Sequence, residues 1–265
     1  AFHKAYTLLC AQAGKPVYVE KPMALNYVEC QEMIQACQNA IVPLFVAYYR
    51  RALSRFLQVK HLIDTQAIGE VRFINITLFQ PLAQQELNSQ TLPWRVIPEV
   101  AGGGHFVDLA SHMLDFLDYV FGPIRSVQGF ASNQAHKYPA EDIVTGTFLF
   151  DSGIHGVGTW CFTSFDKMDM TEIVGSEGKL TYSTFDNQPI VLTTSKGSTE
   201  FSYDWHTGAE SEGVHLVTAP ATDTGGNTGS DTITVTKGGG GIYPVAKYAL
   251  VIGISDYEGL AYDLQ

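Results

Sequence analysis

Residues 2–47 alternate helical and strand patterns with short turns between them, and this alternation constrains the fold more than any other feature. Apolar residues recur at helical spacing over 2–13, and Gly14 ends that pattern. The β-branched and aromatic stretch Val17-Tyr18-Val19 predicts a short strand, which Pro22 must stop because proline cannot donate to a ladder. Lys21 is therefore expected at the exit of this strand.

A second helix and a second strand follow. Asn26 offers an N-cap, with Glu29 three residues later as its capping-box partner, for a helix over 27–39. The apolar run 41–47 predicts a strand that is buried on both faces of a parallel sheet and starts at Leu44, after Pro43. Helix–strand–helix–strand at this spacing is typical of the end of a doubly wound sheet. The inward faces of the two helices are expected to carry Phe2, Ala5, Leu8, Leu9 and Ala13, then Val28, Met33, Ile34 and Cys37.

Both strands deliver charged side chains at their carboxyl ends, where ligands of open α/β sheets bind. Lys21 leaves the first strand, and Tyr48-Tyr49-Arg50-Arg51 leaves the second. Arg50 and Arg51 are either contacts to an anion or substrate or solvated charges beside a helix, and the pattern leaves both open.

A helix over 53–65 and a central strand over 71–79 come next, and then a glycine-rich stretch that feeds a helix over 105–120. Asp108 and His112 are four residues apart and are expected on one face of that helix. A carboxylate beside an imidazole suits proton transfer, although a capped, half-buried helix with a satisfied histidine is the plainer interpretation. His105, Asp108 and His112 also have a conceivable metal-ligand spacing, but no further ligand is visible and no metal is predicted.

From residue 124 onward the pattern changes to strands that are separated by turns. We expect an antiparallel meander with strands over 126–132, 143–150, 154–162, 168–174, 179–183, 190–194 and 200–203. One face of this sheet is expected to pack on helices, and the other to serve as a subunit interface.

Charge and cysteine content exclude several classes of function. The chain has 16 basic and 27 acidic residues and a net charge of −11, which argues against nucleic acid or an anionic membrane as a partner. No apolar run approaches the roughly 20 residues of a membrane span. The four cysteines lack metal or redox spacing, so we expect free thiols and a cytoplasmic location. Because the chain opens on Ala1, inside a helical pattern, its natural N-terminus is expected to be missing.

Over residues 1–206 the chain resembles the Gfo/Idh/MocA family, the relatives of glucose–fructose oxidoreductase and inositol dehydrogenase. The resemblance rests on the order and spacing of several short motifs: Gly14-Lys15-Pro16-Val17, Glu20-Lys21-Pro22, Tyr49-Arg50-Arg51, Ile68-Gly69-Glu70-Val71, Trp94-Arg95, Gly102-Gly103-Gly104 with Asp108 and His112, and Glu172–Gly178.

The resemblance implies hydride transfer between NAD or NADP and a hydroxyl carbon of a sugar, cyclitol or related polyol. Lys21 would polarise the reacting hydroxyl, His112 would act as general acid or base, and Asp108 would assist it. It further implies cofactor contacts from Glu20, Lys21 and Pro22, and substrate contacts from Arg50, Trp94, Arg95 and Asp108. The chain lacks the family's first βαβ units, with their Gly-rich turn, so an N-terminally truncated enzyme is expected. The alternative is a non-catalytic carbohydrate-binding or oligomerisation domain that lacks cofactor binding.

The expected fold class is therefore α/β plus α+β: the C-terminal remnant of a Rossmann doubly wound sheet, then a mostly antiparallel open-sheet domain with helices on one face. The predicted domains are 1–48 (partial dinucleotide-binding) and 49–206 (substrate and oligomerisation). Residues 207–241 resemble the end of a bacterial immunoglobulin-like repeat with a glycine linker, and 242–265 resemble the first strand of a caspase-like peptidase. We expect this tail to come from a composite or truncated reading frame. The expected partners are a small polyol or sugar and further copies of the chain.

Overall fold

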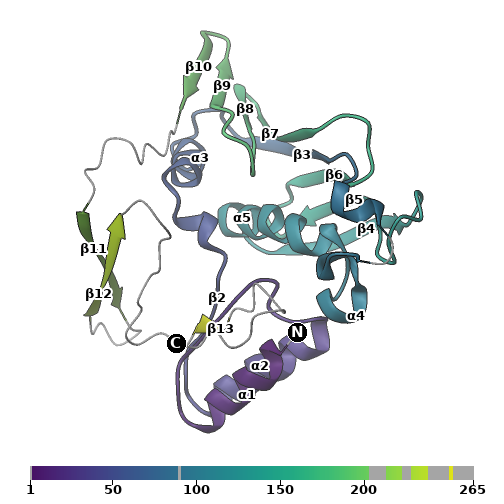
Figure 1. Cartoon of the computed structure of the whole chain (residues 1–265). Helices are drawn as coiled ribbons and strands as arrows, with labels where there is room; N and C mark the ends of the chain where they lie inside the picture. Colours follow the sequence, from purple (N-terminus) through teal and green to yellow (C-terminus); the bar gives the residue numbers. More distant parts are fainter. Residues whose placement is uncertain (1, 89–90, 203–212, 223–227, 238–250, 253–265) are drawn as a thin grey trace. The chain divides into compact units, whose positions relative to one another are not determined.

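The computed structural model describes residues 2–88, 91–202, 213–222, 228–237 and 251–252, the last three segments as backbone alone. Its elements, shown in Figure 1, are α1 (His3–Gln12), β1 (Val17–Val19), α2 (Tyr27–Asn39), β2 (Leu44–Val46), the 3-10 turn η1 (Tyr49–Ala52), α3 (Ser54–Asp64), β3 (Val71–Phe79), the 3-10 turns η2 (Gln84–Leu87) and η3 (Trp94–Val96), α4 (Pro98–Ala101), the π turn η4 (Phe106–Ala110), α5 (Ser111–Phe121), β4 (Ile124–Ser132), β5 (Ile143–Phe150), β6 (His155–Cys161), β7 (Met168–Gly175), β8 (Gly178–Tyr182), β9 (Ile190–Thr194), β10 (Gly197–Phe201), β11 (Gly213–Thr222), β12 (Thr228–Lys237) and β13 (Val251–Ile252).

The N-terminal part has the predicted helix–strand–helix–strand order. β1 and β2 pair in parallel, with Val17 opposite Leu44 and Val19 opposite Val46. The buried faces of α1 and α2 close over these strands and form a small core of Cys10, Ala11, Val17, Val19, Met33 and Cys37. The Asn26 side chain accepts the backbone N–H of Glu29 at 3.0 Å, so the predicted N-cap of α2 is confirmed.

The predicted inward faces are partly wrong. On α1, Phe2 and Leu9 are exposed, whereas His3 and Thr7 are buried. On α2, Val28 is 62% exposed. The buried side chains of α1 are His3, Thr7, Cys10 and Ala11, so tertiary packing overrides the distribution of large apolar residues.

The second strand is not buried on both faces. Phe45 of β2 is 56% exposed and Tyr18 of β1 is 39% exposed, while Val17 and Val19 on the opposite face of β1 are buried. Among the described residues, α1 and α2 cover one face of these two strands. An apolar run therefore marks a strand correctly without saying whether the second face is covered.

The larger part of the molecule is an eight-stranded sheet with the order β10-β9-β8-β7-β3-β6-β5-β4. The prediction of a central strand over 71–79 is confirmed, because β3 lies between β6 and β7. The prediction of one continuous meander is wrong, since β3 pairs parallel to β6 and separates β4-β5-β6 from β7-β8-β9-β10. β3 is distant in sequence from β6 and β7. It inserts between them because it carries an apolar face, which is covered only at a central position of the sheet.

Helices α3 and α5 cover one face of this sheet (Figure 1), and the main core lies between these helices and the sheet. Phe56 of α3 and Phe116 of α5 meet edge to face at 4.8 Å, above the buried side chains Ile74 and Ile76 of β3. Gly156 of β6 also faces this core, and a Cβ atom there would lie 2.0 Å from the Phe148 ring. The glycine thus leaves room for a large aromatic side chain.

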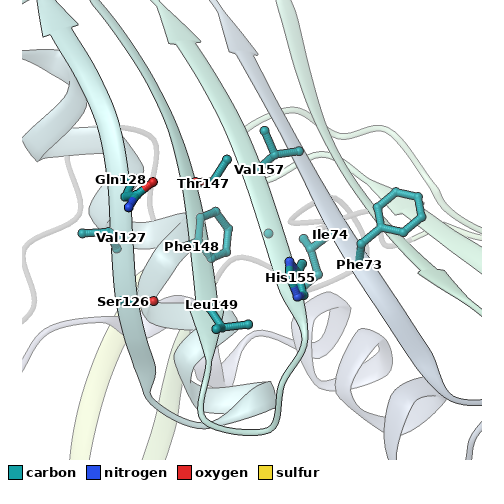
Figure 2. A pocket seen from close by; sticks show the side chains of 11 residues that line it. Phe73, Ile74, Ser126, Val127, Gln128, Thr147, Phe148, Leu149, His155 and Val157 are labelled. Atoms are coloured by element: carbon teal, nitrogen blue, oxygen red, sulfur yellow. The ribbon is translucent and has the colours of Figure 1, made fainter.

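The other face of the sheet is open among the described residues. Its partly or fully exposed apolar side chains are Phe73, Phe130, Val157, Met168 and Met170. A hollow of about 400 Å³ in the sheet is lined by residues of β3, β4, β5 and β6, including Ile74, Thr147 and His155. Figure 2 shows how these side chains lie.

Residues 2–202 belong to one compact unit, and β11 and β12 form an antiparallel hairpin in a second unit. The resemblances predicted for 207–241 and 242–265 lie largely outside the described residues. Among the described helices, none has the length and the apolar character needed to cross a membrane. The four cysteines are free thiols, as expected.

Candidate functional site

Lys21 leaves β1 at its carboxyl end, as predicted, and reaches across to the turn before α5. Its ammonium group donates to Asp108 Oδ1 at 2.5 Å and to the Asp108 carbonyl oxygen at 3.3 Å. Both side chains are 18% exposed. A charge-assisted hydrogen bond between partly buried partners fixes the position of the Lys21 cation more firmly than an exposed pair would.

The turn that carries Lys21 is held from two sides. Glu20 Oε2 accepts the backbone N–H of Lys21 at 3.1 Å, and the His3 ring donates from Nδ1 to the Pro22 carbonyl oxygen at 3.0 Å. The peptide bond between Lys21 and Pro22 is cis. Burial lowers the pKa of His3, whereas its bond to the Pro22 carbonyl raises it. Glu20 and Pro22, predicted as cofactor contacts, therefore also hold the backbone around Lys21.

Asp108 is placed by an unusual entry into α5. The predicted helix over 105–120 is confirmed, but its first part is a π turn over Phe106–Ala110, and the regular α5 begins at Ser111. π turns of this kind occur frequently at functional sites. Gly102 precedes it with a φ of +84°, and a Cβ atom there would lie 2.5 Å from the Leu25 carbonyl oxygen. Gly102 thus allows a close approach of two backbones.

Arg95 lies beside the same carboxylate and stacks on Trp94. Arg95 Nε is 3.4 Å from Asp108 Oδ2, and its guanidinium group stacks 4.6 Å from the Trp94 ring centroid. Two cations, Lys21 and Arg95, therefore share the single charge of Asp108. The structure brings together three of the predicted site residues at this point.

His112 lies one turn beyond Asp108 and is 4% exposed. Burial, together with the charges of Lys21 and Arg50, lowers its pKa to about 3, while Asp108 acts in the opposite direction. Its Nδ1 atom is buried and has no hydrogen-bond partner among the described residues. The imidazole is therefore neutral at pH 7 and can exchange a hydrogen bond with a ligand hydroxyl group.

Aromatic side chains enclose the imidazole. The ring centroids of Tyr48, Tyr49 and Phe185 lie 5.8, 5.7 and 6.1 Å from that of His112. Neither Phe185, which comes from the loop after β8, nor His3 is among the predicted site residues. Tyr48 and Tyr49 had a local signal, since they directly precede the charged strand exit.

The two arginines after β2 point to different partners. Arg51 forms an ion pair with Asp115 of α5 and is thus not a free anion contact, while its side chain is 39% exposed. Arg50 donates from Nη1 to the Thr184 carbonyl oxygen at 2.8 Å, and it stacks on Phe185 at 4.7 Å. Of the pair, Arg50 is the one whose charge reaches His112.

His105 does not join Asp108 and His112. Its Nε2 atom is paired with the buried carboxylate of Glu86 in η2, and its ring lies 5.3 Å from Phe162. His105 thus lies apart from Asp108 and His112, the two residues with which it was considered as a metal ligand. Among the described residues, no group of three histidine, cysteine or acidic side chains is arranged to hold a metal ion.

Two family models match the chain. Residues 1–48 match the oxidoreductase family with an NAD-binding Rossmann fold, and residues 56–181 match the GFO/IDH/MocA C-terminal domain. These matches confirm the predicted fold class, a Rossmann-type start followed by a mostly antiparallel sheet domain with helices. Neither match includes residues 182–265.

Three similar proteins show the extent of the relationship. Oxidoreductase P35 of Formosa agariphila is 33% identical over 203 residues, which cover 77% of this chain and 62% of that protein. The trans-1,2-dihydrobenzene-1,2-diol dehydrogenase of Bos taurus is 26% identical over 176 residues, 66% of this chain and 50% of that enzyme. The crystal structure of the WlbA dehydrogenase from Bordetella pertussis, in complex with NADH and UDP-GlcNAcA, has a TM-score of 0.63 and 26% identity, with 78% of this chain and 57% of that chain covered. The chain thus spans between half and two thirds of the length of the relatives it matches.

Proposed function

Because residues 1–48 and 56–181 belong to domains of the Gfo/Idh/MocA oxidoreductase family, we propose that the chain takes part in NAD(P)-dependent hydride transfer to or from a hydroxyl carbon of a sugar, cyclitol or related polyol. The observation that carries this proposal is the joining of Lys21, at the end of β1, to Asp108, one turn before His112. A cation and a neutral imidazole then stand on one side of the place where a hydroxyl group would react.

Each residue has its own role in the proposed reaction. When bound, the nicotinamide cofactor accepts or supplies the hydride. The Lys21 ammonium group stabilises negative charge on the substrate oxygen, and Asp108 keeps that group in place. His112 is neutral before the reaction. It orients the substrate hydroxyl group and exchanges a proton with it. Arg50, Trp94 and Arg95 contact the substrate around this centre.

The donor set fits a nicotinamide ring at the end of β1. The charged side chains of Glu20 and Lys21 lie there beside Pro22, on a turn that the His3 bond holds in place. These three residues would hold the nicotinamide end of NAD or NADP.

Calorimetric titration of the chain with NAD(H) and NADP(H) tests the proposal. We expect binding that Lys21→Ala weakens strongly, because Lys21 lies at the nicotinamide end of the site. Lys15→Ala is the matched control: this exposed lysine lies on the same segment, and its loss should leave binding unchanged. If no nicotinamide cofactor binds, the result favours the second candidate, a carbohydrate-binding or oligomerisation domain without a cofactor site.

We extend the proposal to assembly and domain boundaries. The open face of the large sheet, with Phe73, Phe130 and Val157, is apolar enough to be the surface on which copies of the chain associate. The domains would run over 1–48 and 49–206, followed by the separate tail pieces 207–241 and 242–265. A cytoplasmic location fits the four free thiols.

A further inference from the structure

Arg50 is a cation without a carboxylate partner, beside the group proposed to exchange protons. Among the described residues, no acidic side chain lies within ion-pair distance of its guanidinium group, and its Nε atom is buried with no hydrogen-bond partner. One Nη atom is used by the Thr184 carbonyl oxygen. Burying a charge without a counter-ion is unfavourable, so Arg50 at this position lowers the stability of the fold.

The nearest acid is already occupied. Asp169 of β7 accepts backbone N–H groups from Thr184, Phe185 and Asp186, at 3.0 Å and 3.1 Å for the first and last of them. Burial lowers the pKa of Arg50, and the charge of Asp169 opposes that effect. Asp169 thus shapes the loop after β8 and compensates Arg50 only in part.

Arg50 and His112 stand against the same two aromatic rings. The Arg50 guanidinium carbon is 5.3 Å from the Tyr49 ring centroid and 4.7 Å from that of Phe185. The same rings lie 5.7 Å and 6.1 Å from the His112 ring. A ligand that meets His112 therefore also comes within reach of the Arg50 charge.

Hydrogen bonds hold the loop that carries Phe185 in place. Arg55 donates to the carbonyl oxygens of Ser183 and Asp186 at 2.7 Å and 2.6 Å, and Asp169 holds the amides of the same loop. Several charge-assisted hydrogen bonds thus fix the loop that carries one of the two shared rings.

The charges around His112 add up to a small positive excess. The charged groups that act on the imidazole are the cations Lys21 and Arg50 and the acid Asp108. One positive charge is left, inside a chain whose net charge is −11. A single negative charge on the ligand would balance it, whereas a phosphate group with nearly two charges would exceed it.

We propose that Arg50 binds a carboxylate group of the substrate, so that the chain acts on sugar acids, such as uronic or aldonic acids, rather than on neutral sugars. This assignment rests on the proposed function, because it places the acid on the same molecule whose hydroxyl group meets Lys21 and His112. Arg50 is then a residue that determines specificity, since it recognises a group remote from the reacting carbon.

Matched pairs of ligands test the proposal by calorimetry on the full chain. The pairs are D-glucuronate with D-glucose and D-galacturonate with D-galactose, each with and without NADH. We expect the preferred acid to bind about tenfold to a hundredfold more tightly than its neutral partner, the range of one hydrogen bond to a charged group. Arg50→Gln should reduce that ratio to near one, and Arg50→Lys, which keeps the charge, should retain part of it.

Arg72→Gln is the control, since this exposed arginine of β3 is paired with Glu70 and its loss changes the net charge equally. It should leave the ratio unchanged. Thermal unfolding of each variant separates folding from recognition, because a merely structural Arg50 would lower the melting temperature and leave the ratio intact.

Three results would overturn the proposal: equal or tighter binding of the neutral sugars by the wild type, an unchanged ratio in Arg50→Gln, or tighter binding of glucose 6-phosphate than of either uronate. The proposed function fails separately. A preference for acids that depends on Arg50, without any binding of NAD(H) or NADP(H), would reject hydride transfer and keep the carboxylate site.

Discussion

At the scale of single residues, the site is defined by a histidine that burial keeps neutral and by a lysine that a carboxylate keeps in place. His112 is nearly inaccessible, and Lys21 and Arg50 both disfavour its protonation. A neutral imidazole can hydrogen-bond a hydroxyl group at any pH near neutrality, so the role of His112 does not depend on a pKa close to 7. The spacing of Asp108 and His112 predicted that these two side chains lie on one face of a helix. It did not predict the positive charges of Lys21 and Arg50.

His112 should make the folded chain sensitive to acid. Its pKa is about 3 in the folded state and about 6.5 in the unfolded chain, so between these values the unfolded chain binds the extra proton. Stability from this residue is therefore complete above pH 6.5 and is lost as the pH falls. From pH 7 to pH 5.5 the free energy of unfolding should fall by about 1 kcal/mol through His112 alone. Urea unfolding at both pH values measures it.

The variant His112→Gln should lose that part of the pH dependence, and His61→Gln, at an exposed position of α3, should keep it. Equal losses of stability in wild type and His112→Gln over this range would contradict a buried, neutral His112.

At the scale of elements, the position of Asp108 depends on how the chain enters α5. Gly102 ends α4 in a left-handed conformation, and its backbone lies against that of Leu25, four residues after Lys21. The same contact therefore joins the turn after β1 to the segment that leads to Asp108. The glycine-rich stretch predicted the start of a helix, and only the folded chain shows that Gly102 lies against Leu25.

Gly102→Ala should destabilise the chain more than Gly153→Ala. Both glycines have a φ near +85°, at +84° and +86°, so both variants pay for a left-handed alanine, about 1–2 kcal/mol. Only the Cβ atom at 102 would meet backbone, 2.5 Å from the Leu25 carbonyl oxygen, whereas nothing lies within 4 Å at 153. The steric conflict should add about 1–3 kcal/mol.

Chemical denaturation of the two variants, beside wild type, gives the difference directly. Similar losses for both would mean that the contact between Gly102 and Leu25 relaxes without cost. Weaker cofactor binding in Gly102→Ala alone would further link this contact to the position of Lys21.

At the scale of the whole molecule, the large sheet has a helix-covered face and an open face. The core between α3, α5 and the sheet supplies stability, and the open face carries apolar side chains that a monomer would leave in water. The hollow of Figure 2 lies on this sheet, and its lining residues do not include Lys21 or His112. Assembly and chemistry thus belong to different surfaces in the proposal.

Phe130→Lys should weaken self-association. Phe130 lies on the open face of β4 and is 85% exposed, so a lysine there costs the monomer little but places a charge in the proposed interface. Phe165→Lys is the control, because Phe165 is 95% exposed in the loop between β6 and β7. Sedimentation velocity should give twice the 29.0 kDa of one chain for wild type and Phe165→Lys, and a shift toward the monomer for Phe130→Lys. A monomeric wild type at micromolar concentration would refute the interface.

Local sequence patterns were enough to predict the order of elements, the strand exit at Lys21, the N-cap at Asn26 and the position of Asp108 one turn before His112, because each depends on residues close together in the chain. Three features needed the tertiary structure: the insertion of β3 between β6 and β7, the inward face of α1, and the rings of Tyr49 and Phe185 between Arg50 and His112. Each of them joins segments far apart in sequence, and their side chains are selected by packing and charge in three dimensions, which no local periodicity records.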